Sequence, residues 1–254
     1  EITGNKAITT GEQSFIECKN IQNIILIGSN ISIGSQSFSN CTSLKTVSIE
    51  IEIVTFGSFA FISCIKLESI SIKGKDISIG YRSFYLCALL KDITLIGNKI
   101  TIGDETFYDN KAITDFKIDA NNISIGTNAF CSCTSIENIS FKTSNISIGN
   151  NAFSNCIKFI RISIESEEVS IGYRSFNPCS VLKSIVIIGR KSITFIDQSF
   201  YESRQVKDVT LIGNKINMAK HVFYNCVNMN SLFIETKSIS IGANSFQLCS
   251  NLEN

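Results

Sequence analysis

Cysteine is the residue whose number and spacing in this chain most suggest chemistry. The chain has ten cysteines, and nine of them stand three residues after a phenylalanine. These nine are Cys18, Cys41, Cys64, Cys87, Cys133, Cys156, Cys179, Cys226 and Cys249. The tenth, Cys131, directly follows Phe130. So many cysteines in an extracellular protein would normally suggest disulfides, so the first question is whether these thiols pair, bind a metal or are simply buried.

The replacements within this column favour burial. Two of its positions hold Asn110 and Ser203, which suits a small buried group that hydrogen-bonds to the backbone. Neighbouring α-carbons at a strand spacing of about 4.8 Å would permit a disulfide, but parallel side chains make the required dihedral angle awkward. Zinc needs four ligands in a tetrahedral arrangement, which a straight column of thiols does not give. The CxC at 131–133 also lacks a second pair of ligands, so we expect no zinc site. We predict buried, reduced thiols, with Cys131 the most reactive.

The other candidates for catalysis lack partners. The lone histidine, His221, occupies a column that elsewhere holds Gln36, Arg82, Asn128 and Arg174, and we expect it at an exposed convex position. No base and nucleophile accompany it. Neither a GxSxG motif nor the glycine pattern of a phosphate-binding or dinucleotide-binding loop occurs. We therefore predict no catalytic residue, no metal and no cofactor.

The elements that must position these residues follow a strict repeat. Eleven phenylalanines fall 23 residues apart, with one extra residue in the turn at 190–192. They are Phe15, Phe38, Phe61, Phe84, Phe107, Phe130, Phe153, Phe176, Phe200, Phe223 and Phe246. This regularity predicts eleven coils stacked in register. We expect each phenylalanine between its neighbours, Phe107 for example between Phe84 and Phe130.

Each coil contains two short alternating apolar runs separated by a polar turn. Val47 and Ile49 form one such first run, and Ile31 and Ile33 form a second run closed by Gly34. Alternation of this kind predicts strands with one buried face, here two parallel strands per coil. We expect the glycine to supply an unusual backbone angle. The phenylalanine and cysteine, at i and i+3, would share one face of a short helical or 3₁₀ turn.

The segment from Leu90 to Gly103 shows the repeat most clearly. Its sequence, LKDITLIGNKITIG, has the LxxLxLxxNxL spacing of a leucine-rich repeat. The fold predicted is therefore a leucine-rich-repeat solenoid, β-rich, that occupies residues 1–254 as one domain. Longer identical sequences, such as SIGYRSF at 78–84 and again at 170–176, suggest duplication of blocks of several coils.

Charge and hydropathy exclude two classes of partner. The formal net charge is +1, which gives no electrostatic footprint for nucleic acid or an anionic membrane. No stretch approaches the roughly 18 consecutive apolar residues of a membrane helix. We expect no nucleic-acid partner and no direct membrane insertion by this segment.

The sequence pattern of the repeat resembles that of BspA-like leucine-rich repeat proteins. The resemblance rests on LxxIxI, a polar turn, IxIGxxSF or IxIGxxAF, and then xxCxxL, along the whole chain. Proline is nearly absent from the turns, where many members carry it. The resemblance implies a surface-exposed, extracellular adhesin or receptor that binds host proteins or other cells.

The outward positions of the first strands are the default binding face, by analogy with other solenoids. Near the centre of the array, this face carries charged or long polar side chains, which we predict to bind the ligand. The residues are Asp92, Thr94, Asp115, Lys117, Asn138 and Arg161. A simply solvated strand face is the alternative interpretation. Asn30, Asn122 and Asn145 share one column before the second strand and are N-glycosylation candidates for a chain that enters a eukaryotic secretory route.

Two functions therefore stay open. The first is a non-catalytic binding or adhesion module at a cell surface, with a protein or cell-surface ligand. The second is a structural subunit that assembles head to tail into filaments. The chain begins and ends at nearly the same point of the repeat, without capping segments. We expect either a fragment of a longer array or head-to-tail self-association.

Overall fold

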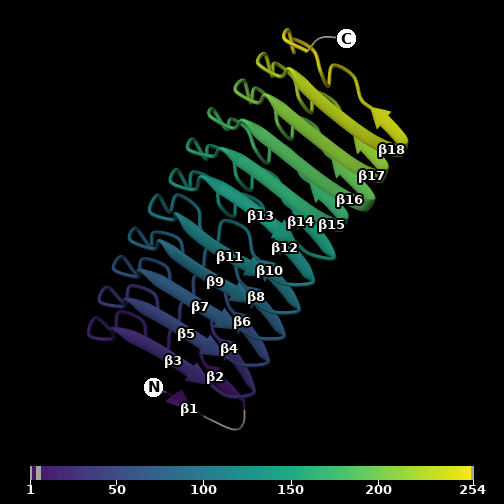
Figure 1. Cartoon of the computed structure of the whole chain (residues 1–254). Coiled ribbons are helices and arrows are strands. Elements are labelled where there is room, and N and C mark those ends of the chain that lie inside the picture. Colours follow the sequence, from purple (N-terminus) through teal and green to yellow (C-terminus); the bar gives the residue numbers. More distant parts are fainter. Residues whose placement is uncertain (1, 4–6, 253–254) are drawn as a thin grey trace. The chain divides into compact units, whose positions relative to one another are not determined.

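The computed structural model describes residues 2–3 and 7–252, without the side chains of Ile2, Thr3 and Asp115. The chain divides into two compact units, residues 1–133 (unit 1) and 134–254 (unit 2). Each is a β-solenoid whose coils contribute one strand to a first ladder and one to a second (Figure 1). The predicted leucine-rich-repeat solenoid is confirmed.

Unit 1 has separate strands in its two ladders. The first ladder contains β1 (Ile2–Thr3), β3 (Asn23–Ile27), β5 (Thr46–Glu50), β7 (Ser69–Lys73), β9 (Asp92–Ile96) and β11 (Asp115–Asp119), in that spatial order. The second ladder contains β2 (Ile8–Thr10), β4 (Asn30–Ile33), β6 (Ile53–Phe56), β8 (Asp76–Ile79), β10 (Lys99–Ile102) and β12 (Asn122–Ile125). The described part of unit 1 therefore contains six coils.

Unit 2 merges the two ladders in most of its coils. Its first coil has separate strands, β13 (Asn138–Lys142) and β14 (Asn145–Ile148). The next four coils have one long strand each: β15 (Arg161–Ile171), β16 (Ser184–Phe195), β17 (Asp208–Met218) and β18 (Ser231–Ile241). The β15–β16 register shifts between Ser166 and Glu168, at the corner where the first ladder becomes the second.

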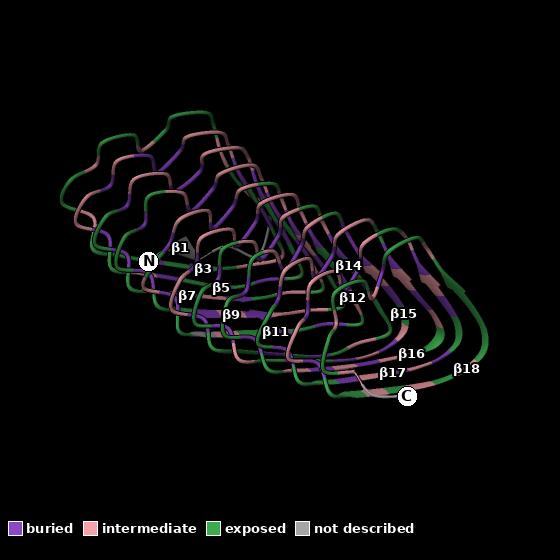
Figure 2. Ribbon diagram, turned by 90° about the horizontal axis from the view of Figure 1, so that it is seen from above, coloured by how far each residue is buried: buried purple, intermediate pink, exposed green. Residues whose placement is uncertain are grey.

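The described strand pairs within the ladders are parallel, and their register is continuous except for shifts in β15–β16 and β16–β17. On β5 and β7, for example, Val47 pairs with Ile70 and Ile49 with Ile72. In β5 Val47 and Ile49 are buried and the intervening side chains face outward, whereas Ile239 and Ile241 of β18 are exposed. Figure 2 shows buried and exposed stretches alternating along each coil. Alternation therefore produces one apolar interior and one polar surface in each unit.

The segment that closes each coil is a run of β-turns, so the predicted helical or 3₁₀ turn is wrong. In the second coil, Ser37 N donates to Gly34 O, Ser39 N to Gln36 O and Cys41 N to Phe38 O. The intervening amides of Gln36, Phe38 and Asn40 donate to the next coil. Gln36 and Asn40 have positive φ angles, which a type II turn requires at its third position. The described residues contain no helix, and therefore none long and apolar enough to cross a membrane.

The recurring glycine allows the backbones of neighbouring coils to approach closely. None of the described glycines has a positive φ, so the backbone angle we expected it to supply is not its purpose. A Cβ at Gly80 would lie 2.6 Å from Phe56 O, and one at Gly103 would lie 2.7 Å from Ile79 O. Real Cβ atoms do not come so close to backbone. The glycine therefore lets each coil settle on the one before it.

The phenylalanine column fills the interior beside the turns. Phe107 is fully buried, and its ring centroid lies 5.4 Å from that of Phe84 and 5.0 Å from that of Phe130. The predicted position of Phe107 is confirmed. Stacked rings of this kind bury large apolar areas and add favourable ring–ring contacts.

Candidate binding surfaces

The outward face of the first ladder in unit 1 contains four of the predicted binding residues. Asp92 and Thr94 lie on β9, Asp115 and Lys117 on β11. The register pairs Asp92 with Asp115 and Thr94 with Lys117. The side chains of Asp92 and Lys117 are exposed and Thr94 is half-buried, whereas the Asp115 side chain lies outside the described part. Two strands thus present Asp92, Thr94 and Lys117 on one face.

The other two predicted residues form a separate pair in unit 2. Asn138 on β13 and Arg161 on β15 are directly paired in the ladder, and both are exposed. The glycosylation candidates are the first residues of β4, β12 and β14. Asn30 and Asn145 are exposed and Asn122 is half-buried. Glycan attachment at these positions stays a prediction.

A charged cluster that the sequence did not predict occupies the corner between the ladders of unit 2. Glu165 forms ion pairs with Lys142 Nζ, at 3.3 Å, and with Arg190. Arg190 also reaches Glu167, at 3.5 Å. The hydrogen bond from Lys142, with the nearby positive charges, lowers the pKa of Glu165. The available signal was the extra residue at 190–192, which places an arginine beside the glutamates of the preceding coil.

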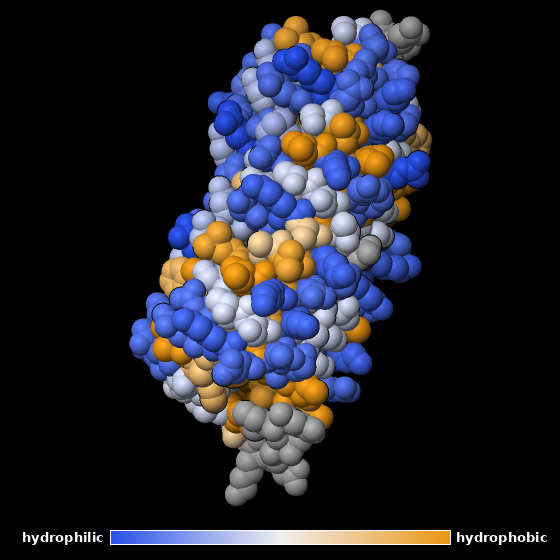
Figure 3. Space-filling view, turned by 90° about the vertical axis from the view of Figure 1, so that its left-hand side faces the viewer, coloured by the Kyte–Doolittle hydropathy of each residue, from blue (hydrophilic) through white to orange (hydrophobic). Residues whose placement is uncertain are grey.

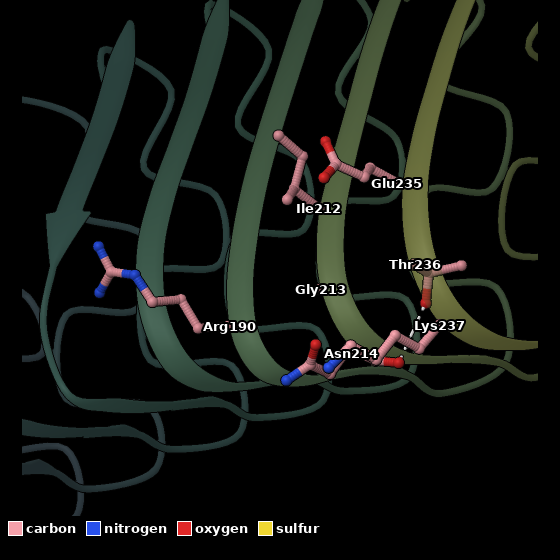
Figure 4. Close-up of a pocket in the computed structure, with 7 residues that line it drawn as sticks. All are labelled: Arg190, Ile212, Gly213, Asn214, Glu235, Thr236 and Lys237. Carbon is pink, nitrogen blue, oxygen red and sulfur yellow. Dashed lines mark hydrogen bonds between the residues drawn. The ribbon is translucent and has the colours of Figure 1, made fainter.

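A shallow groove of about 430 Å³ lies beside this cluster (Figure 4). Its lining residues are Arg190, Ile212, Gly213, Asn214, Glu235, Thr236 and Lys237. The Thr236 hydroxyl donates to Asn214 O at 3.3 Å. In Figure 4 the Arg190 guanidinium points away from the other side chains. The groove mixes both charges around one apolar side chain, Ile212.

The cysteine column has the buried, hydrogen-bonded character that its replacements predicted. Cys64 Sγ donates to Phe38 O at 3.2 Å, Asn110 Nδ2 to Phe84 O at 2.8 Å, and Ser203 Oγ to Phe176 O at 3.3 Å. Seven column members form no disulfide and show the same kind of bond: Cys41, Cys64, Cys87, Cys133, Cys179, Cys226 and Cys249.

Burial also makes these thiols poor nucleophiles. Desolvation raises the pKa of Cys41 to about 11 and that of Cys87 to about 12, and thiolate, the reactive form, is correspondingly scarce. Cys18 and Cys249 are only half-buried, so slow alkylation is expected of the fully buried members alone. The greater reactivity of Cys131 stays a prediction.

His221 contacts an aromatic ring and an amide side chain. His221 is half-buried, not fully exposed as expected. Its ring lies 5.6 Å from that of Tyr224, edge to face, and its Nε2 lies 3.2 Å from the side-chain nitrogen of Asn244. Within the described residues, no group of three or more histidine, cysteine, aspartate or glutamate side chains could hold a metal ion.

The tyrosines are the functional candidates that sequence reasoning missed. All six lie in the turn segments, either three residues before a phenylalanine of the 23-residue column or one residue after it. They are Tyr81, Tyr85, Tyr108, Tyr173, Tyr201 and Tyr224. The repeated SIGYRSF was the available signal, but it indicated only duplication. Figure 3 shows separate hydrophobic patches among hydrophilic side chains on one side of the molecule.

Comparisons with known proteins agree with this architecture. A family model described as BspA type leucine rich repeat region matches residues 8–136, 100–217 and 188–254. A leucine-rich repeat protein from Bacteroides ovatus is similar in structure, with 20% identity and a TM-score of 0.52. Another from Eubacterium ventriosum has 16% identity and a TM-score of 0.51. Each comparison covers 97% of this chain and 81% of the other. No curated protein matches the chain.

Proposed function

The chain belongs to the BspA type leucine rich repeat family, and from this premise we propose that it is a non-catalytic module that binds a protein ligand at a cell surface. The binding face proposed is the outward side of the first ladder. Its centre in unit 1 is the group Asp92, Thr94, Asp115 and Lys117, and in unit 2 the pair Asn138 and Arg161.

One observation carries the proposal: the side chains on this face project from a rigid, fully paired ladder. The backbones of β9 and β11 are held in register along all five residue pairs. A face that is ordered before binding loses little conformational entropy when a partner arrives. Exposed charges of both signs, such as Asp92 and Lys117, favour a partner with complementary charges, which gives specificity and fast association.

The competing interpretation is a solvated strand face without a ligand. The hydroxyl-rich part of the same ladder, around Ser48 and Ser71, has that character. These two serines provide an internal control, because they lie on the same kind of strand and are themselves uncharged. If the face binds a protein, substitutions at the charged positions reduce binding and substitutions at the serines do not.

The experiment uses the purified chain on a biosensor surface against a panel of purified extracellular matrix proteins. The charged variant combines Asp92→Ser and Lys117→Ser, and the matched control combines Ser48→Ala and Ser71→Ala. We expect a ligand whose affinity falls about tenfold or more with the charged variant and stays within twofold for the control. Equal loss in both variants would contradict this binding face.

Light scattering of the same samples addresses the second candidate. A molar mass that stays constant with concentration fits a binding module. A mass that rises with concentration, without binding to any member of the panel, would replace the proposal with a filament subunit.

A further inference from the structure

The two SIGYRSF segments place an arginine between tyrosine rings in each unit. Their backbones are equivalent: Arg82 N and Arg174 N both donate to the next coil, and both residues have a φ of 49°. Bulky residues rarely adopt positive φ, where asparagine is more tolerant. Three other coils have asparagine there, at Asn128, Asn151 and Asn244. Six further coils have other residues there, Gln13, Gln36, Phe59, Glu105, Gln198 and His221. The turn therefore accepts many side chains at this position and does not by itself require arginine.

In unit 1 the arginine is neutralised. The Arg82 guanidinium lies 5.1 Å from the ring centroids of Tyr81 and Tyr85. Its Nε donates to Glu105 Oε2 at 2.6 Å, and an ion pair joins the same two residues. The remaining surface is aromatic, with Tyr85 and Tyr108 tilted against each other at 5.9 Å. The positive charge of this cluster is already satisfied within the chain.

In unit 2 the arginine has no such counter-ion. The Arg174 guanidinium lies 5.2 Å from the ring of Tyr173 and 5.8 Å from that of Tyr201. Its Nε donates to the neutral amide of Gln198 at 2.5 Å. Among the described residues no carboxylate lies within ion-pair distance of Arg174. One N–H of the guanidinium is used, and the terminal donors stay available for an external acceptor.

The segments that follow the two motifs carry acidic residues at the same positions except at this point. DETFYDN at 104–110 corresponds to DQSFYES at 197–203. The acidic residues in these segments are otherwise equivalent, and only Glu105 is replaced by a neutral residue, Gln198. Glu202 pairs with Arg204 at 3.7 Å, and Asp197 accepts a hydrogen bond from Lys220 N. The charge difference therefore lies at the arginine itself.

Aromatic rings lie beside the cation in unit 2. Tyr201 stacks on Tyr224 with ring centroids 4.9 Å apart and ring planes 6° apart. Tyr173 is 36% exposed. Tyrosine and arginine together are the residues most enriched at the energetic centres of protein interfaces. The stacked rings favour a partner that brings apolar groups of its own.

We propose that the cluster Tyr173–Arg174–Tyr201–Tyr224, the tyrosine face of unit 2, docks an acidic protein segment in which carboxylates alternate with apolar side chains. The guanidinium receives the carboxylate, because its planar donors fit that group. The stacked rings receive the apolar side chains. The surface is separate from the first-ladder face, so each proposal can fail without the other.

The test is fluorescence anisotropy with a labelled dodecapeptide of alternating glutamate and leucine. Control peptides replace glutamate by lysine, or leucine by serine. We expect the intact chain to bind one acidic apolar peptide, and both control peptides to bind at least fivefold more weakly. Gln198→Glu, which recreates the unit 1 pairing, should weaken binding about fivefold, the size of one partly exposed charge pair. Arg82→Gln, the matched control, should leave binding unchanged.

The reverse variant tests the comparison from the other side. Glu105→Gln releases Arg82 and should raise the number of bound peptides from one to two per chain. Unchanged binding by Gln198→Glu, or loss of binding by Arg82→Gln, would overturn the assignment. A sulfated oligosaccharide is tested as a competitor. If it displaces the peptide and binds more tightly than the peptide does, the partner is a glycan and the proposed protein partner is wrong. Circular dichroism of every variant shows whether the fold is retained.

Discussion

Two identical heptapeptides, SIGYRSF at 78–84 and at 170–176, have the same fold and different electrostatic surroundings. In both, the serine hydroxyl donates to two glycine carbonyls and the phenylalanine amide donates to the next coil. The groups that meet the arginine differ: Glu105 and the Tyr85 ring in one unit, Gln198 and the Tyr201 ring in the other. In a solenoid, therefore, the property of a surface residue depends on the residue about one coil away as much as on its own sequence neighbours.

The comparison assumes that both heptapeptides rest on equally rigid interiors, and this can be tested at the phenylalanine column. Phe84 and Phe176 are fully buried and stack on rings of the adjacent coils. Phe84→Ala and Phe176→Ala should each lower the free energy of unfolding by about 3–5 kcal/mol. Denaturant melts with hydrogen exchange measure this loss and locate it to neighbouring coils. A loss below about 1 kcal/mol at either site would contradict the equivalence of the two interiors.

The glycines of the two heptapeptides sharpen the comparison at the backbone. A Cβ at Gly80 would lie 2.6 Å from Phe56 O, and one at Gly172 would lie 2.7 Å from Gly149 C. Gly80→Ala and Gly172→Ala should each destabilise the chain by about 1–3 kcal/mol through overpacking. Chemical denaturation should give similar values for the two. If alanine were stabilising, as it is at a glycine with ordinary φ and free space, the close approach of the coils would be refuted.

The coils after the heptapeptides differ in the group that replaces cysteine. Asn110 Oδ1 is buried without a hydrogen-bond partner among the described residues, whereas the Ser203 hydroxyl has one. Asn110→Cys should therefore raise the free energy of unfolding by about 1 kcal/mol, since an orphaned acceptor is removed. Ser203→Cys, the matched variant, should change it less. A larger gain at Ser203 in thermal melts would show that the orphaned oxygen is not the cause.

The smallest effect concerns the corner charges, which only unit 2 arranges in a network. The folded-state pKa of Glu165 is lowered by Lys142 and Arg190. A lowered pKa stabilises the fold above the unfolded value of about 4.3, and this contribution is lost as the pH falls through the folded value. Glu165→Gln should be less stable than the parent at neutral pH and equal to it at strongly acidic pH. Glu50→Gln, at the same column position without a described ion pair, is the control, and an equal effect there would contradict the account.

The sequence was sufficient to predict the features that repeat in every coil. It was insufficient to predict features that depend on contacts between neighbouring coils. Strict spacing and alternation predicted both ladders, the Phe107 environment and the hydrogen bonds of Asn110 and Ser203. Phenylalanine and cysteine at i and i+3 fit a helical turn as well as consecutive β-turns. The amide of Phe38, which bonds to Ala60 in the next coil, selects β-turns, and no local pattern reports that bond.

The candidate sites show the same division. The exposure of Asp92, Lys117, Asn138 and Arg161 followed directly from alternation. The Arg190 cluster depends on a single inserted residue, and the difference between Arg82 and Arg174 depends on residues in the following coil. Such contacts join positions 23 to 25 residues apart, so they become visible only when the coils are stacked.

The most direct test of the account is to observe both arginines in one sample. Nuclear magnetic resonance resolves the side-chain Nε–Hε signals of Arg82 and Arg174, which Arg82→Gln and Arg174→Gln would assign. On titration with the alternating glutamate–leucine peptide, the Arg174 signal should shift progressively while the Arg82 signal stays in place. Equal shifts of both signals, or a shift of Arg82 alone, would contradict the claim that the neighbouring coil determines which arginine is available to a partner.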